Sequence, residues 1–216
     1  MKKGIIKLIN VTLVVAVIVL IYLAYESIMT PIRFNQAYKQ RSLVVIEKLK
    51  KIRDAEIVYL SIYDKYTGSF DTLINFIKKD SLKIIKSVGV VPDSIYLTSK
   101  TTKEAELRAL KLGIISRDTI KISIKDTLFA NYNVDTLPFI PYTSLTQKFQ
   151  INAGSLKTLS KATRPVFEVK VHNNTFCEGL DPQELINLND RQRKLDRFPG
   201  YVLGSMNEVT TTGNWD

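Results

Sequence analysis

The first part of the chain is apolar on all sides. From Leu8 to Tyr25 the sequence LINVTLVVAVIVLIYLAY runs for 18 residues without a charge. As an α-helix it would cover about 27 Å at ~1.5 Å per residue, close to the thickness of a bilayer's hydrocarbon core. We therefore predict a membrane anchor over residues 8–27, preceded by a cytoplasmic segment, residues 1–7. The anchor residues that we expect to face lipid are Leu8, Val14, Val15, Val17, Ile18, Leu20 and Leu23.

A cleaved signal peptide is the main alternative to an anchor. Signal peptides have a shorter apolar region, roughly 7–15 residues, and small residues at positions −3 and −1 before the cleavage point. Cleavage after Ala24 would place Tyr22 at −3, and cleavage after Ser27 would place Tyr25 there. These bulky rings favour a retained anchor. A buried core helix is a third interpretation, but the chain supplies few helical partners for it.

The charges beside the anchor predict its orientation. Lys2, Lys3 and Lys7 precede the apolar run, and segments rich in lysine stay on the cytoplasmic side. Arg33, Lys39 and Arg41 follow the run, but a long domain is translocated largely regardless of its charge. We expect the N-terminus inside the inner (cytoplasmic) membrane and the main domain in the periplasm.

An amphipathic helix is predicted after the anchor, within a stalk over residues 28–65. Pro31 either ends or kinks the spanning helix. Apolar residues then recur at steps of three and four, which is helical periodicity: Val45, Leu49, Ile52, Ala55, Tyr59 and Ile62. The basic residues between them are expected on a solvated face, and contact with anionic head groups is the alternative: Lys48, Lys50, Lys51 and Arg53.

The remaining pattern predicts an α+β domain over residues 66–205. Ser69 is a good N-cap for the helix FDTLINFIKK, and Thr101 with Glu104 forms a capping box for KEAELRALKL. Period-two alternation predicts strands in DTIKISIKDTLF and RPVFEVKVHN, and QKFQINAG and FPGYVLGS are further candidates. We expect the amphipathic helix to pack on an antiparallel sheet formed by these strands. The polar end, residues 206–216, is predicted to be a flexible tail.

Composition narrows the function classes. The formal net charge is +10, and the basic residues are spread along the chain instead of being concentrated on one element, which argues against a nucleic-acid partner. There is one cysteine, Cys177, and one histidine, His172. These counts exclude an intramolecular disulfide and a zinc site with several cysteines.

Few residues suggest chemistry. His172, Cys177, Glu178 and Asp181 lie within ten residues of one another, and a metal or Cys–His site is one interpretation of them. We expect them instead to be turn residues after a strand, with Asp181 and Pro182 starting a short helix. We therefore predict no catalytic residue, no metal and no cofactor. Trp215, the only tryptophan, is a candidate contact for a protein partner; the alternative is that it docks on its own sheet or is simply solvated.

Residues 1–80 resemble type IV pilins and type II secretion pseudopilins. The residues that carry the resemblance are the leader-like MKKG, then Arg53 and Ala55, and the turn from Lys65-Tyr66 to Ser69-Phe70-Asp71-Thr72-Leu73. Ile9 stands where these pilins have glutamate, and Lys7 interrupts their apolar segment, so we predict no cleavage after Gly4. Later phrases, ALKLGIISRDTIKISIKDTLF and RFPGYVLGSMNE, resemble membrane-anchored proteins of Bacteroidota, which implies an anchor and no particular activity.

These observations together predict a single-pass structural or assembly subunit of a bacterial envelope complex, pilus-like or secretion-like. Its expected partners are the lipid bilayer and other proteins of that assembly. An inner-membrane scaffold or adaptor that never enters a filament is the alternative, and an envelope enzyme is a third hypothesis.

Overall fold

The structure is a computed structural model that describes residues 2–99, 101–143, 146–157 and 162–216. The side chains of residues 2–9, 82–87 and 117–120 are outside this description. The chain forms two compact units. The first consists of Met1–Ser69 and Pro138–Asp216, and the second, Phe70–Leu137, is inserted between these two segments.

One helix, α1 (Lys2–Tyr63), contains both the predicted anchor and the predicted amphipathic segment. It continues through Pro31, whose ring nitrogen cannot donate a helical hydrogen bond. Of the two outcomes predicted for Pro31, termination of the helix is therefore wrong. The helix ends where Asp64 adopts a left-handed conformation, with a φ of 55°, and its N–H bonds the carbonyl of Leu60.

The second half of α1 buries one stripe. The buried positions recur at steps of three and four, as the sequence predicts for most of them: Ser42, Val45, Leu49, Ile52, Ala55, Glu56 and Tyr59. Two expectations need correction. Ile62 is exposed, and Lys48 does not lie on a purely solvated face, because its ammonium group donates to the carbonyl of Phe139 over 2.6 Å. Burial lowers the pKa of Lys48 to about 8.

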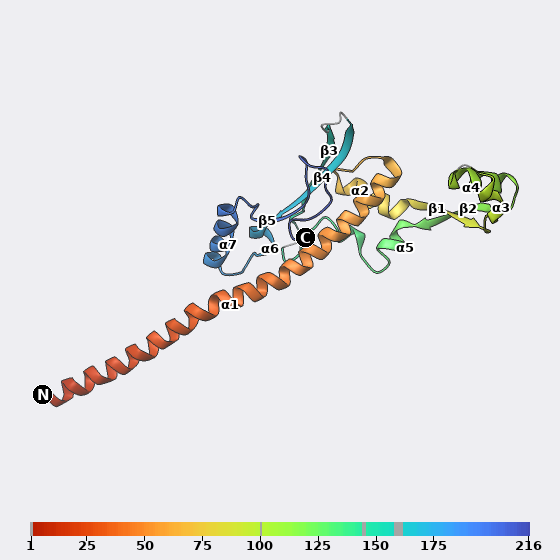
Figure 1. The fold of residues 1–216 in the computed structure, drawn as a ribbon. Helices are drawn as coiled ribbons and strands as arrows, with labels where there is room; N and C mark the ends of the chain where they lie inside the picture. Colours follow the sequence, from red (N-terminus) through yellow and green to blue (C-terminus); the bar gives the residue numbers. More distant parts are fainter. Residues whose placement is uncertain (1, 100, 144–145, 158–161) are drawn as a thin grey trace. The chain divides into compact units, whose positions relative to one another are not determined.

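A three-stranded antiparallel sheet completes the first unit. Its strands β3 (Gln150–Lys157), β4 (Thr163–His172) and β5 (Gly200–Gly204) are arranged in the order β3-β4-β5. In the register, Val169 lies opposite Ile151 on one side and Leu203 on the other. Phe167, Val169 and Val171 are buried, which confirms the predicted apolar face of β4. Figure 1 shows the later part of α1 running beside this sheet.

Two helices connect β4 to β5. They are α6 (Asn173–Phe176) and α7 (Pro182–Lys194). Asp181 caps α7 by accepting a hydrogen bond from Glu184 N, as the Asp-Pro pair predicts. Asn173, which is buried, donates from Nδ2 to the side-chain oxygens of Asn189 and Gln192, over 2.9 and 2.6 Å. This amide network fastens α7 to α6.

The second unit consists of short elements around a two-stranded ribbon. In chain order they are α2 (Phe70–Lys79), β1 (Ser81–Val88), α3 (Asp93–Leu97), α4 (Thr102–Lys111), β2 (Ser116–Ser123), α5 (Ile124–Leu128) and the 3-10 helix η1 (Val134–Thr136). The predicted cap of α4 is confirmed, since the Thr101 hydroxyl accepts from Glu104 N, and Gly113 has the positive φ, 69°, of a residue that ends a helix.

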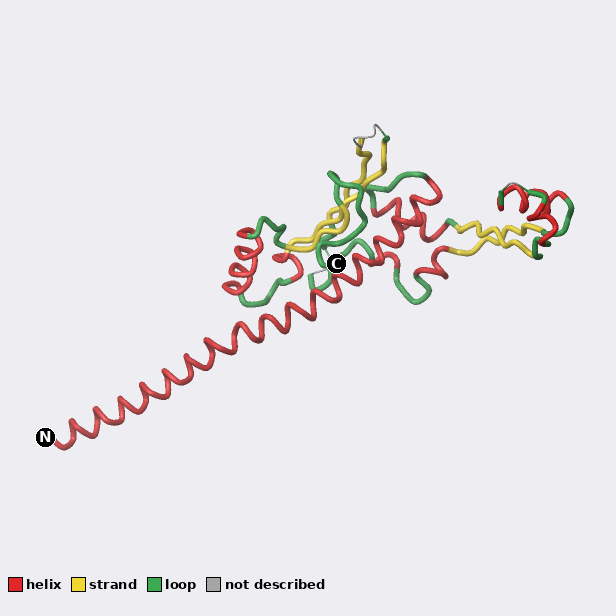
Figure 2. Tube along the Cα trace, in the orientation of Figure 1, coloured by secondary structure: helices red, strands yellow, loops and turns green. Residues whose placement is uncertain are grey.

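The predicted strand DTIKISIKDTLF is only partly correct. It ends at Ser123, because the Ser123 hydroxyl accepts from Asp126 N and starts α5. Its first half pairs with β1 in antiparallel register, Ile84 opposite Ile120, and belongs to a sheet separate from β3–β5 (Figure 2). The expected inward direction of the Ile120 side chain lies outside the described residues.

Candidate functional site

The apolar half of α1 is an exposed hydrophobic surface. Leu8 lies in this helix, but its side chain is outside the described residues. The other predicted lipid-facing side chains are between 45% and 64% exposed: Val14, Val15, Val17, Ile18, Leu20 and Leu23. In the part of the chain that the structure describes, α1 is the one helix long and apolar enough to cross a membrane, and none of its most apolar window is buried. It is consistent with a single membrane span or a signal sequence, and not with the buried helix of a soluble core.

Directly beyond this segment, α1 joins the folded part of its unit. Arg41 donates from Nη1 to the carbonyl oxygens of Phe176 and Glu178, over 2.9 and 2.8 Å. The Tyr38 hydroxyl lies 3.3 Å from that of Tyr201 on β5, and its ring stacks on Phe176. Burial raises the pKa of Tyr38 above its ordinary value of 10, so its hydroxyl remains protonated. The apolar segment is thus continuous with a helix that is fastened to α6 and β5.

A buried carboxyl group marks the far end of α1. Glu56 is fully buried, and its Oε2 accepts a hydrogen bond from Thr67 N over 3.0 Å. Its other oxygen has no hydrogen-bond partner among the described residues. Burial raises the pKa of Glu56 to about 8, while the Thr67 N–H acts in the opposite direction. The carboxyl group is therefore mostly protonated at neutral pH, and it holds the turn that follows the helix.

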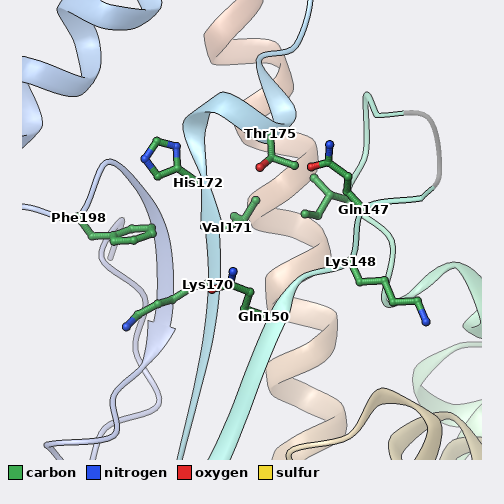
Figure 3. A pocket seen from close by; sticks show the side chains of 9 residues that line it. Gln147, Lys148, Gln150, Lys170, Val171, His172, Thr175 and Phe198 are labelled. Carbon is green, nitrogen blue, oxygen red and sulfur yellow. The ribbon is translucent and has the colours of Figure 1, made fainter.

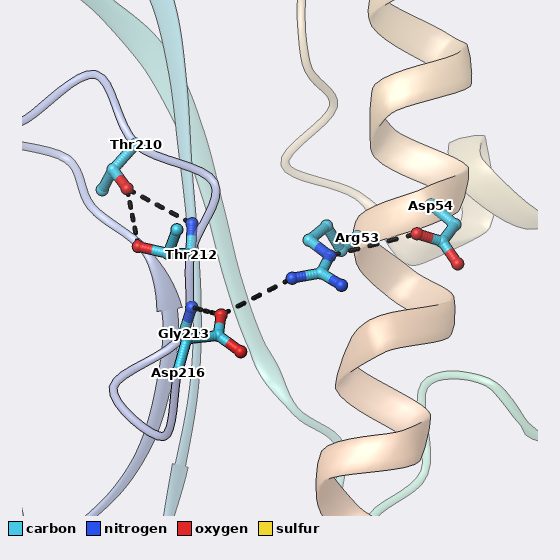
Figure 4. Close-up of polar contacts among 6 residues, drawn as sticks. All are labelled: Arg53, Asp54, Thr210, Thr212, Gly213 and Asp216. Atoms are coloured by element: carbon cyan, nitrogen blue, oxygen red, sulfur yellow. Dashed lines mark hydrogen bonds and ion pairs between the residues drawn. The ribbon is translucent and has the colours of Figure 1, made fainter.

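The end of the chain lies along β5, although the sequence predicts a flexible tail there. Gly204 N donates to the carbonyl of Thr212, and Asn214 N donates to that of Val202. Asp216 accepts from Gly213 N over 2.9 Å and lies 3.6 Å from the guanidinium of Arg53 on α1 (Figure 4). These contacts cover the β5 edge of the sheet. A mobile tail was expected from its polar composition, but backbone groups and asparagine can bond a strand edge without apolar side chains.

Trp215 packs on its own unit. Its ring meets that of Tyr201 edge to face, with 5.9 Å between the centroids, and is half-buried. It covers Gly213 so closely that any side chain at that position would overlap the indole. The indole Nε1 is buried and has no hydrogen-bond partner among the described residues. Docking on its own sheet is thus the observed arrangement, and contact of Trp215 with a protein partner stays a prediction.

The polar residues around Cys177 have structural roles. Cys177 is buried, and burial raises the pKa of its thiol to about 12, the opposite of what an activated nucleophile needs. His172 accepts at Nδ1 from Asn174 N, and Asp181 caps α7. Among the described residues no three His, Cys, Asp or Glu side chains come together as metal ligands.

Two of these features were not predicted from the sequence: the buried Glu56 and the ion pair of Arg53 with Asp216. Glu56 follows Ile52 by four residues and precedes Tyr59 by three, so the same periodicity that identified the stripe places it on the buried face. No local sequence pattern predicts the ion pair of Arg53 with Asp216, because the two residues are 163 positions apart in the chain.

Comparison of the chain with protein-family models, with curated proteins and with solved structures finds no match in any of the three.

Proposed function

We propose that this chain is a single-pass, membrane-anchored structural or assembly subunit of a bacterial envelope complex, pilus-like or secretion-like. The observation that carries the proposal is the two-part character of α1. Its first half exposes an uninterrupted apolar surface, and its second half buries a stripe in the folded unit. Such a helix suits a protein that is held in lipid at one end and presents a fixed domain outside the membrane.

The proposed topology has the N-terminus in the cytoplasm and the domain outside the inner membrane. Lys2, Lys3 and Lys7 support it through the preference of lysine for the cytoplasmic side. The proposal assigns no catalytic role and no cofactor. Its partners are the bilayer and neighbouring subunits of the assembly.

Cysteine labelling tests the topology. Asn207 is exposed and distant from the apolar segment, so a cysteine placed there by Asn207→Cys is accessible. Cys177 need not be replaced, since it is buried and its thiol pKa is about 12. A membrane-impermeant maleimide should label Asn207→Cys in intact spheroplasts, and the parent chain should stay unlabelled. Labelling only after lysis would contradict this topology and would place the domain in the cytoplasm. Release of the chain from membranes by alkaline carbonate would contradict the proposal that the chain has a membrane anchor.

An inner-membrane scaffold that never enters a filament is the second candidate function. Two residues favour it over a pilin: Ile9 replaces the glutamate of the pilin pattern, and Lys7 interrupts the apolar segment. N-terminal sequencing and intact mass of the membrane-extracted chain distinguish the candidates. A retained leader supports the scaffold, whereas a chain that begins at Ile5 supports the filament subunit.

A further inference from the structure

A cavity of about 340 Å³ opens in the first unit where β3 begins and β4 ends. Its walls come from β3, β4, α6 and the segments that precede β3 and β5 (Figure 3). The volume lies at the lower end of the roughly 300–1,000 Å³ typical of small-molecule sites. The cavity shares no residue with the anchor or with the C-terminal tail.

The polar side chains of this cavity are mainly neutral. Gln147 and Gln150 contribute carboxamides, and Thr175 contributes a hydroxyl. Figure 3 shows the Gln147 carboxamide next to the Thr175 side chain, whose hydroxyl is directed away from Gln147. A carboxamide donates two hydrogen bonds and accepts at its oxygen, and a hydroxyl both donates and accepts. These groups therefore match a ligand whose own polar groups do both.

His172 adds a directed donor. Because its Nδ1 accepts from Asn174 N over 3.1 Å, the neutral ring carries its proton on Nε2. Burial, and secondarily the charge of Arg193, lower the pKa of His172, which favours this neutral form at pH 7. A neutral imidazole offers one N–H donor without adding charge to the cavity.

The apolar part of the wall is small and includes one aromatic ring. Ile140 and Val171 are buried, and Phe198 packs edge to face against His172 with 5.9 Å between the ring centroids. An aromatic ring beside hydrogen-bonding groups offers a place for the apolar C–H face of a ring-shaped ligand. A purely ionic ligand would leave this surface unused.

The two lysines of the wall are partly engaged elsewhere. Lys170 pairs with Glu168 over 2.7 Å and lies over the Phe198 ring. Lys148 lies over the ring of Phe139, and in Figure 3 its ammonium group extends away from Gln147 and Thr175. Free anions are therefore not the best match for the cavity, although no acidic residue is among the described residues that line it.

From this combination we propose that the cavity is a binding site for a neutral saccharide unit. A sugar ring carries several hydroxyl groups that each donate and accept, and it has an apolar C–H face. The amides of Gln147 and Gln150, the Thr175 hydroxyl and the His172 Nε2–H would bond its hydroxyls, and Phe198 would contact its C–H face. The site does not depend on the anchor, so this proposal can be tested independently of the function proposed above.

Saturation-transfer NMR on the full chain tests the proposal. The protein is held in a detergent without a sugar head group and is given glucose or N-acetylglucosamine. Inorganic phosphate is then added as a competing ligand. We expect transfer to at least one of the sugars at millimolar concentration. The double variant Gln150→Ala/Thr175→Val should weaken that binding about tenfold, since it removes two of the proposed hydrogen bonds to the sugar.

Matched controls separate the cavity from the rest of the surface. Gln40→Ala and Thr163→Val change the same residue types at exposed positions that do not line the cavity, and they should leave sugar binding unchanged. Thermal unfolding of each variant checks that the fold is retained. If the chain transfers saturation to neither sugar, the proposal is overturned. Sugar binding that persists in the double variant, or a sugar signal displaced by phosphate, overturns it equally.

Discussion

The backbone of Thr67 donates a hydrogen bond to the fully buried carboxyl group of Glu56, over 3.0 Å, and so ties the turn after α1 to the helix. Thr67 in turn accepts at its hydroxyl from Ser69 N, immediately before α2. The segment that leaves the helix is therefore positioned by a polar group within the apolar stripe. The burial of that group has consequences for stability.

Stability should fall as pH rises from about 4.5 to about 8, because of Glu56. Its pKa is raised from 4.5 to about 8, so the folded state holds the proton more tightly than the unfolded state does. The loss of stability is complete above the pKa that Glu56 has in the folded state. At pH 7 it amounts to on the order of 3 kcal/mol. We expect Glu56→Gln, which keeps an acceptor oxygen for Thr67, to raise the melting temperature at pH 8 and to flatten its pH dependence.

Glu47→Gln is the matched control, since Glu47 lies exposed on the same helix. Melting temperatures of the full chain in detergent, measured across this pH range, compare the three proteins. An unchanged pH dependence in Glu56→Gln would contradict the assignment of the effect to this carboxyl group.

The buried stripe of α1 should be essential for the stability of its unit. Leu49 is fully buried, whereas Leu43 on the same helix is 61% exposed. Leu49→Ala should destabilise the chain by about 2–5 kcal/mol through lost burial and the cavity left behind. Leu43→Ala should change it by less than about 0.5 kcal/mol. Denaturant unfolding of both variants provides the measurement. Equal effects would mean that the stripe faces lipid or a partner instead of the core.

Trp215 should report that the tail is docked. As the only tryptophan, half-buried against Tyr201, it should emit at shorter wavelength than a free indole and resist iodide quenching in part. Gly213→Val should displace the ring, because any side chain there overlaps it, and should shift the emission to longer wavelength. Fully exposed emission from the parent chain would argue against docking and in favour of a tail that waits for a partner.

The amide network between α6 and α7 should contribute measurably to stability. Asn189 is buried, accepts from Asn173 over 2.9 Å and donates to Asn174 over 2.7 Å. Asn189→Ala leaves the buried Asn173 amide with one acceptor fewer, and it should lower the free energy of unfolding by about 1–3 kcal/mol. Asn187→Ala, at an exposed position of the same helix, should cost much less. A neutral Asn189→Ala in denaturant unfolding would show that α7 is held by other contacts.

Local signals accounted for most of the elements. The range of α2, the Thr101 cap of α4, the Asp181 cap of α7 and the alternating face of β4 follow from neighbouring residues, because caps and periodicity act within a few positions. The apolar segment from Leu8 to Tyr25 is equally local. Its length and lack of charge make it suitable for a membrane, whatever fold the rest of the chain adopts.

Only the tertiary structure decided how these elements combine. Alternation in 118–124 and in 164–172 looks the same in sequence, yet the first strand pairs with β1 and the second with β3 and β5. Strand pairing depends on contacts between distant residues, which a single sequence does not encode locally. The same reason explains the docked tail and the cavity, whose walls come from residues 140–198. The burial of Glu56 lies between these cases: its position on the stripe is a local property, and its raised pKa exists only because the fold removes water from it.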